Sequence, residues 1–148
     1  MAEPIAAAPS VRLQRPWTVS AGLGSPDLVR VDLTYSINDA FTVGGALGFG
    51  PLGAMGSANG LFHALRSPNH GHSLTLGVGL AVAPGIAQMA GNGAYVGADA
   101  NLGWEYRSEA CGFTSRLSVG PALYAGFGGP QPEVFVVPKA VATVGWSF

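Results

Sequence analysis

Residues 72–82 have the sequence HSLTLGVGLAV, in which large apolar residues alternate with small or polar ones. The apolar stretch continues to Gly91, which is long enough to suggest a membrane-spanning helix. However, Pro84 and several glycines interrupt it, and its first half has a period of two with the large residues on one parity. This period indicates a β-strand with one apolar face.

The same alternation recurs along the chain and predicts eight strands, each near the roughly 9–11 residues that a tilted membrane strand needs. The expected segments are Pro16–Leu23, Leu28–Ser36, Ala40–Phe49, Ala58–Arg66, His72–Val82, Ala94–Tyr106, Gly112–Ala125 and Val134–Phe148. The fourth segment is the least regular, because Phe62 and Ala64 compete with Leu61, His63 and Leu65 for the apolar face. A β-bulge in this strand would account for the break in parity.

Composition favours a lipid-covered surface. Charged residues make up 10% of the chain, against about 25% in an ordinary soluble domain. Strands with one apolar and one polar or small face suit an antiparallel sheet, and in lipid such a sheet must close on itself. We therefore expect an all-β fold, an eight-stranded antiparallel up-and-down transmembrane β-barrel over residues 16–148. A soluble lipocalin-like barrel, with its large residues turned inward, is the rival fold.

Residues 1–15 are expected to be a flexible periplasmic segment. The first ten lack the basic and continuous apolar regions of a signal peptide, which suggests the start of a mature exported chain. The net charge is −1 and no basic stripe occurs, so a nucleic-acid partner is not expected. The single cysteine, Cys111, cannot form an internal disulfide and is interpreted as a bystander.

Connections between the predicted segments alternate in length and character. The short polar ones are 37–39, 67–71 and 107–111, and the longer ones, rich in Gly, Ala and Pro, are 50–57, 83–93 and 126–133, with 24–27 a short exception. Outer-membrane barrels have short periplasmic turns and longer outer loops. This pattern predicts a bacterial outer-membrane location with both termini periplasmic.

Aromatic residues gather at the strand ends, as the interfacial girdles of a membrane barrel do. The girdle expected at the periplasmic side consists of Trp17, Tyr35, Phe41, Trp104, Tyr106, Phe113, Trp146 and Phe148. A second band at the opposite side would contain Phe49, Tyr95, Tyr124, Phe127 and Phe135.

The last strand ends with alternating apolar residues and a terminal phenylalanine: Ala142, Val144, Trp146 and Phe148. This ending resembles the C-terminal signal of bacterial outer-membrane proteins, and the architecture of residues 16–148 resembles small barrels of the OmpA and OmpX type. The resemblance implies that the outer-membrane assembly machinery recognises Val144, Trp146 and Phe148.

By parity, the lumen is expected to hold three acids, three bases and an amide. These are Arg30, Asp32, Asp99, Asn101, Glu105, Arg116 and Lys139. Buried charges must be paired or solvated, so they would form a balanced network that fixes the barrel, or else a charged constriction for ions. Many inward positions are glycine or alanine, so some water is expected inside.

Catalytic and metal sites have little support in the sequence. His70, His72 and Ser73 cluster near one turn, but His72 and Ser73 face opposite sides of a strand and no acid is near in sequence. His63, His70 and His72 do not have the spacing of a closed metal site. Neither a metal nor a cofactor is expected.

The function favoured by the sequence is non-enzymatic: a scaffold, adhesion or accessory subunit. Its outer loops carry apolar residues that would contact a partner protein, namely Pro51, Leu52, Met55, Ile86, Met89 and Phe127. Membrane lipid is the other expected partner. The alternatives are a narrow pore for ions or small solutes and a lipid-modifying outer-membrane enzyme.

Overall fold

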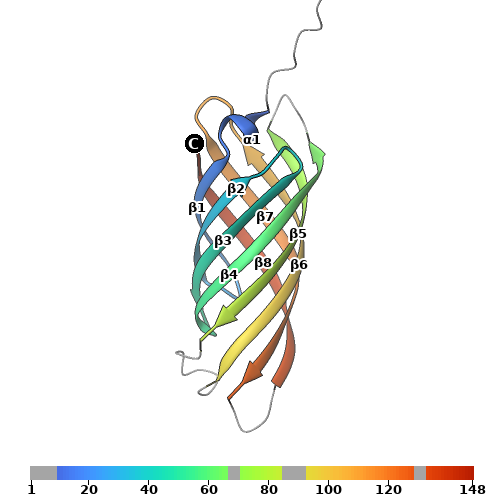
Figure 1. The fold of residues 1–148 in the computed structure, drawn as a ribbon. Helices are drawn as coiled ribbons and strands as arrows, with labels where there is room; N and C mark the ends of the chain where they lie inside the picture. The colour runs from blue at the N-terminus through green and yellow to red at the C-terminus, as the bar shows by residue number, and fades with distance from the viewer. Residues whose placement is uncertain (1–9, 67–70, 85–92, 129–132) are drawn as a thin grey trace, which may run out of the picture.

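The computed structural model describes residues 10–66, 71–84, 93–128 and 133–148. Eight antiparallel strands, each paired with its neighbours in the chain, form a closed barrel, and β1 pairs with β8 (Figure 1). The strands are β1 Trp17–Ser25, β2 Val29–Ser36, β3 Phe41–Gly50, β4 Gly53–Arg66, β5 His72–Ala83, β6 Ala94–Arg107, β7 Phe113–Phe127 and β8 Glu133–Ser147. The predicted fold class is confirmed.

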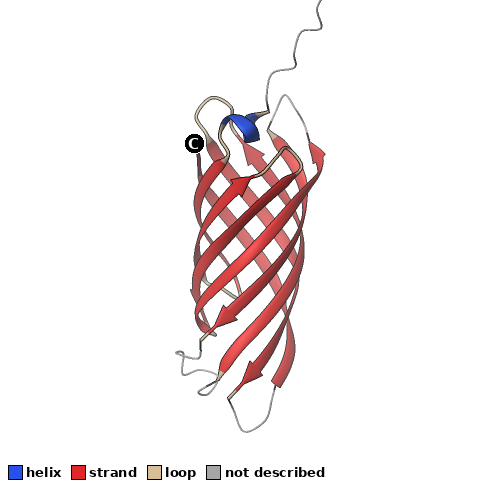
Figure 2. Ribbon diagram, in the orientation of Figure 1, coloured by secondary structure: helices blue, strands red, loops and turns tan. Residues whose placement is uncertain are grey.

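One short helix, α1 (Val11–Gln14), precedes the barrel. Figure 2 shows it at the same end as the C-terminus. We call this the terminal end and the opposite end the loop end. Phe148 is tied to Trp17 by backbone hydrogen bonds in both directions, of 2.9 and 3.2 Å, so the last residue of the chain helps to close the barrel. No helix in the described part of the chain is long and apolar enough to cross a bilayer.

The irregularity expected in the fourth strand is present. The register between β4 and β5 shifts between His63 and Leu65, which is a β-bulge or a similar irregularity. On the N-terminal side of the shift Leu61 and His63 point inward and are buried, while Phe62 is 40% exposed. Beyond it Leu65 also faces out, because the shift changes the parity of the strand. His63 is therefore left in the interior.

Large apolar side chains stand on the outer face, and polar ones fill the inside. Val78, Leu80 and Leu47 are 65%, 65% and 74% exposed, whereas Asp32 and Thr75 are fully buried. Charged side chains on the outside lie at the two rims in the described residues, as Arg66 and Glu133 do. This distribution is the inverse of a soluble barrel, and it suits a surface in contact with hydrocarbon.

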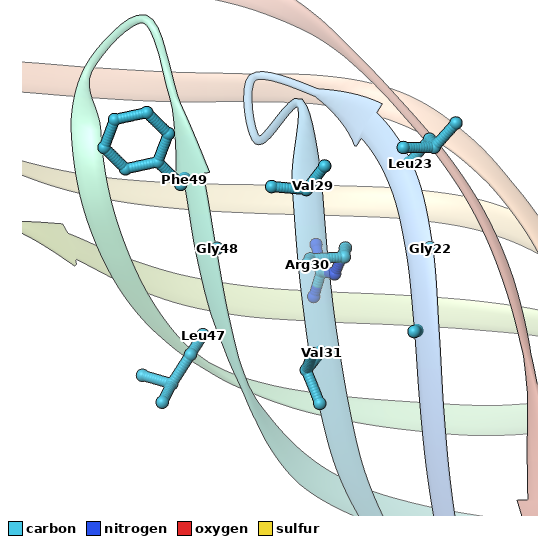
Figure 3. Close-up of a pocket in the computed structure, with 9 residues that line it drawn as sticks. Gly22, Leu23, Val29, Arg30, Val31, Leu47, Gly48 and Phe49 are labelled. Atoms are coloured by element: carbon cyan, nitrogen blue, oxygen red, sulfur yellow. The ribbon is translucent and has the colours of Figure 1, made fainter.

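Part of the outer face is drawn in Figure 3, where a shallow apolar hollow crosses β1, β2 and β3. Large outward side chains such as Leu23, Val31 and Leu47 border it, and Gly22 and Gly48 contribute only their backbone to its floor. The hollow is continuous with the apolar surface on either side of it, and we interpret it as lipid-facing.

The expected alternation of short and long connections is wrong in two places. β7 ends at Phe127 and β8 begins at Glu133, so the expected long connection 126–133 is reduced to 128–132, the same length as 67–71 and 108–112. β3 and β4 extend to Gly50 and from Gly53, so the predicted loop 50–57 is reduced to Pro51 and Leu52. Small residues had hidden the strand, since Gly and Ala show little contrast between faces. Connection 84–93 remains long, and most of it lies outside the described residues, including Ile86 and Met89.

The flexible segment expected at residues 1–15 also needs correction. From Ser10 onward the chain is packed against the barrel: α1 is formed, and Val11 and Arg12 are 6% and 5% exposed. Burial of these two side chains holds the segment, and sequence periodicity could not show this in so short a stretch. Residues 1–9 lie outside the described residues.

Candidate functional site: the filled lumen

The structure places the seven expected lumen residues on the inner face and joins them to further polar side chains in three groups. The Asp32 cluster contains Asp27, Arg30, Asp32 and Arg116. The Asp99 group contains Asp99, Asn101 and Lys139. The Glu105 cluster, at the terminal end, contains Arg12, His63, Ser73, Glu105 and Arg107.

In the Asp32 cluster one fully buried carboxylate holds two guanidinium groups. Arg30 donates from Nε and Nη2 to the two oxygens of Asp32 at 3.0 and 2.8 Å, a bidentate arrangement. Arg116 donates to the same carboxylate at 3.2 Å from across the barrel, and Asp27 accepts from Arg30 at 3.0 Å. Such charge-assisted pairs are the strong hydrogen bonds of protein interiors. They link β2 to β7 through the lumen.

The Asp99 group ties β6 to β8. Lys139 Nζ lies 2.7 Å from Asp99 Oδ2, and Asn101 donates to the other oxygen at 2.9 Å. A Cβ placed on Gly79 would lie 2.5 Å from Asp99 Oδ2, and one on Gly77 would lie 2.4 Å from Asn101 Oδ1. These inward glycines therefore make room for the side chains of the next strand. We had expected these small residues to leave space for water, but the side chains of Asp99 and Asn101 occupy that space.

The Glu105 cluster lies directly beneath α1. Arg12 donates to Ser73 Oγ at 2.7 Å and to Glu105 Oε1 at 3.2 Å. Arg107 approaches the same oxygen of Glu105 at 3.5 Å. Arg107 also donates to the carbonyl of Arg15 at 3.2 Å, which is one direct bond between the barrel and the backbone of the terminal segment.

A chain of hydroxyl and imidazole contacts continues from this cluster around the lumen wall. Ser73 Oγ lies 2.9 Å from His63 Nδ1, and His63 Nε2 lies 3.0 Å from Thr42 Oγ1. Thr42 Oγ1 is 3.2 Å from Ser36 Oγ, to which Arg107 donates at 3.3 Å. Each hydroxyl and each imidazole nitrogen on this path has a partner, so the mouth of the barrel is lined by a connected network.

The contact between Ser73 and His63 revises one sequence interpretation. We expected Ser73 to have neither a base nor an acid near it, yet His63 is adjacent and Glu105 is joined to it through Arg12. Long-range pairing across β4, β5 and β6 creates this group, and no local motif could reveal it. Ser73 and His63 are 2% and 0% exposed, so a substrate could reach Ser73 only after α1 moved.

Little empty space remains between the Glu105 and Asp32 clusters. A cavity of about 10 Å³ lies there, lined by threonine and serine side chains together with Glu105, Arg107 and Arg116. A volume of roughly 10–15 Å³ accommodates a single water molecule. Side chains therefore fill this level of the lumen, as expected for eight strands.

An apolar group closes the lumen towards the loop end. Its buried members are Met55, Ala81, Ala83, Tyr95, Ala122 and Tyr124, with Leu52, Phe135 and Val137 packed against them. The expectation that Tyr95, Tyr124 and Phe135 belong to an outer girdle is therefore wrong, because the rings of both tyrosines point inward and Phe135 packs against them. Met55 also points inward and is 4% exposed, so it is not part of an outward apolar loop tip. The members of the expected band that do face outward are Phe49 and Phe127, which are 60% and 54% exposed.

The aromatic residues at the terminal end do lie on the outer face or at its edge, and they form a series of ring contacts. Trp17 and Tyr35 have centroids 4.8 Å apart, and Phe113 and Trp146 are 5.7 Å apart. Trp104 and Tyr106 stack at 6.5 Å, and Phe41, Trp146 and Phe148 are 49%, 58% and 65% exposed. Phe62 and His72, which sequence reasoning left out, extend the band through contacts with Phe41 and Trp104.

Two other expectations concern single residues. Cys111 is exposed in the β6–β7 turn, where its Sγ donates to Ser108 Oγ at 3.4 Å, and hydrogen bonding with Ser108 and with the backbone of Phe113 lowers the pKa of its thiol. In the described part of the chain no three His, Cys, Asp or Glu side chains are grouped as metal ligands. His70, one of the three histidines considered, lies outside the described residues.

No family model matches the chain, and no curated protein matches it. Among solved structures, the chain is similar to the solid-state NMR structure of outer membrane protein AlkL in DMPC lipid bilayers. The TM-score is 0.46 with 11% sequence identity, and the match covers 100% of this chain and 96% of the other.

Proposed function

We propose that this chain is a non-enzymatic scaffold or accessory subunit of the bacterial outer membrane, whose loop end contacts a partner protein. The observation that carries the proposal is the filled lumen. Ion pairs join its walls, side chains leave a cavity of about 10 Å³ at the level of Arg107 and Arg116, and α1 covers the terminal end. A lumen packed in this way supports a structural role over transport.

Conductance in planar lipid bilayers tests the filled lumen. We expect the purified barrel to insert without discrete openings, and Asp99→Asn to change nothing in the current, although it breaks the pair with Lys139. Discrete openings in the native protein that change in size or ion preference with Asp99→Asn would instead establish the narrow pore.

The apolar rim of the loop end supports the partner contact. Leu28, in the β1–β2 connection, is 59% exposed, and Phe127, at the end of β7, is 54% exposed. A photo-crosslinking residue at Leu28 should give a discrete protein adduct in cells. The matched position is Ile37, which is 54% exposed in a connection of the terminal end and should give none. Adducts at neither position, or equally at both, would contradict a partner at the loop end.

We further propose that the terminal end faces the periplasm. Two observations support this orientation. The first strand begins and the last strand ends at the terminal end, and the last strand carries the assembly-signal pattern Val144, Trp146 and Phe148. Cys111 provides the test, because it is exposed at this end and the pKa of its thiol is lowered. A membrane-impermeant maleimide should label Cys111 only after the outer membrane is permeabilised. Labelling in intact cells would reverse the orientation.

The non-enzymatic part of the proposal rests on the state of Ser73. Its oxygen already accepts a hydrogen bond from Arg12 and contacts His63, and all three side chains are buried. We expect the lipid composition of cells to be the same with the native protein and with Ser73→Ala. A lipid species that depends on Ser73 would establish the enzyme.

A further inference from the structure

We infer that α1 is a displaceable plug, whose removal opens a polar vestibule at the terminal end of the barrel. The vestibule is the lumen surface around Thr42, His63, Ser73, Glu105 and Arg107, which α1 and Arg12 now cover. This inference concerns access to the lumen and does not depend on whether a partner binds the loop end.

The first support is the way α1 is attached. Its backbone hydrogen bonds are internal: Leu13 and Gln14 donate to the Ser10 carbonyl, and Arg15 donates to Val11. The contacts that join it to the barrel include the buried side chains of Val11 and Arg12 and the bond that Arg107 donates to the Arg15 carbonyl. A single helical turn is not stable alone, so α1 depends on its contacts with the barrel.

The second support is the charge balance of the lumen. Without α1, the three groups contain four acids and four bases, which are Asp27, Asp32, Asp99 and Glu105, and Arg30, Arg107, Arg116 and Lys139. Arg12 adds a positive charge to an interior that is already neutral. When α1 leaves, Glu105 keeps Arg107 and Ser73 keeps His63. Departure of Arg12 therefore leaves no buried charge unpaired. An unpaired buried charge is the usual obstacle to removing one partner of a buried ion pair.

The third support is that Arg12 does not satisfy all of its hydrogen-bond donors while α1 is docked. Two of its possible hydrogen bonds are made from the same atom, Nη2, and the buried Nε has no hydrogen-bond partner among the described residues. A buried donor without a partner weakens the docked state relative to one in which every donor is satisfied. Elements held by few contacts are those that open locally while the rest of the protein stays folded.

Thiol accessibility in the folded barrel tests the inference. The probe is Thr42→Cys in a Cys111→Ser background, since Thr42 faces the vestibule and is 1% exposed. A water-soluble methanethiosulfonate reagent should modify this probe slowly when α1 is native. Arg12→Ala should raise the modification rate by about tenfold or more, because the docked state loses its charge-assisted hydrogen bonds. Leu13→Ala is the matched control: Leu13 lies on the same helix, is 44% exposed, and should leave the rate unchanged.

A second form of the experiment guards against misfolding of the Arg12 variant. A site for a specific protease is inserted after Arg15, the barrel is folded, and α1 is then cut off. Heat-modifiable gel migration verifies the fold before and after cleavage. The cleaved barrel should react as fast as Arg12→Ala. An unchanged slow rate after cleavage would overturn the inference, and so would a native protein that reacts as quickly as the cleaved one.

Discussion

A series of arginine substitutions along the outer face of β5 tests whether this surface lies in hydrocarbon. Leu74 pairs with Trp104 of the aromatic band, so it marks one interface. A strand rises about 3.4 Å per residue and tilts about 40° in a barrel, so each outward position lies roughly 5 Å deeper than the last. Leu76, Val78, Leu80 and Val82 then lie roughly 5, 10, 16 and 21 Å from that interface in an apolar band about 25 Å tall.

The energetic profile follows from these depths. Arginine costs about 2–4 kcal/mol at the midplane of a membrane barrel and about 0–1 kcal/mol near the interfaces. Val78→Arg and Leu80→Arg should therefore lower the free energy of unfolding by about 2–4 kcal/mol. Leu76→Arg and Val82→Arg lie at similar distances from their nearest interfaces, and each should cost about 1 kcal/mol.

Reversible urea unfolding in phosphatidylcholine vesicles, followed by tryptophan fluorescence, measures the series. Val78→Leu is the control at the same position, because it keeps an apolar side chain and should stay within about 0.5 kcal/mol of the native protein. A profile that is flat along the strand would refute the membrane orientation, since an arginine on a water-exposed surface has no depth dependence. A stable barrel in the absence of detergent or lipid would refute it too.

Three further outcomes are expected. Asp32→Asn should destabilise the barrel by about 3–5 kcal/mol in the same assay, because Arg30 and Arg116 lose their shared carboxylate; a loss below about 1 kcal/mol would contradict the lumen network. Gly97→Ala should cost about 1–3 kcal/mol, because its Cβ would lie 2.5 Å from the ring of Tyr124. Gly60→Ala, where a Cβ has no atom within 4 Å, should be neutral, and equal effects at the two glycines would argue against this packing. Removing Phe148 should slow assembly in cells while leaving the purified barrel able to refold in detergent, and an unchanged assembly rate would remove it from the signal.

The sequence allowed the strands and their faces to be predicted wherever large and small residues alternate. β5 is the best case, since every second residue from Leu74 to Val82 is large and every one of them faces out. The strand over Gly53–Ser57 was not predicted, because glycine and alanine provide no contrast between the two faces. The outward direction predicted for Tyr95 and Tyr124 was wrong for another reason. A tyrosine suits a membrane interface or a lumen equally well, so its place at a strand end does not tell which face it occupies.

The candidate site was predictable only in part. Parity placed Asp32 and Lys139 inside, because charge on an outer face would be excluded by lipid. Pairing could not be predicted, since the partners of Asp32 come from strands far apart in the chain. Arg12 was missed altogether, because a single buried arginine before the first strand leaves no periodic pattern.

The two glycine–tyrosine contacts at the loop end have a consequence for how the barrel acquires its stagger. β6 and β7 set Gly97 opposite Tyr124 and Tyr95 opposite Gly126. A slip of one residue is forbidden because it would turn every side chain over, but a slip of two preserves the inside and the outside. Sliding two residues one way would set the two tyrosines against each other, and the other way would set Tyr124 against Asp99. The two glycine–tyrosine contacts therefore select one register between β6 and β7 among the registers that keep the same side chains inside and outside.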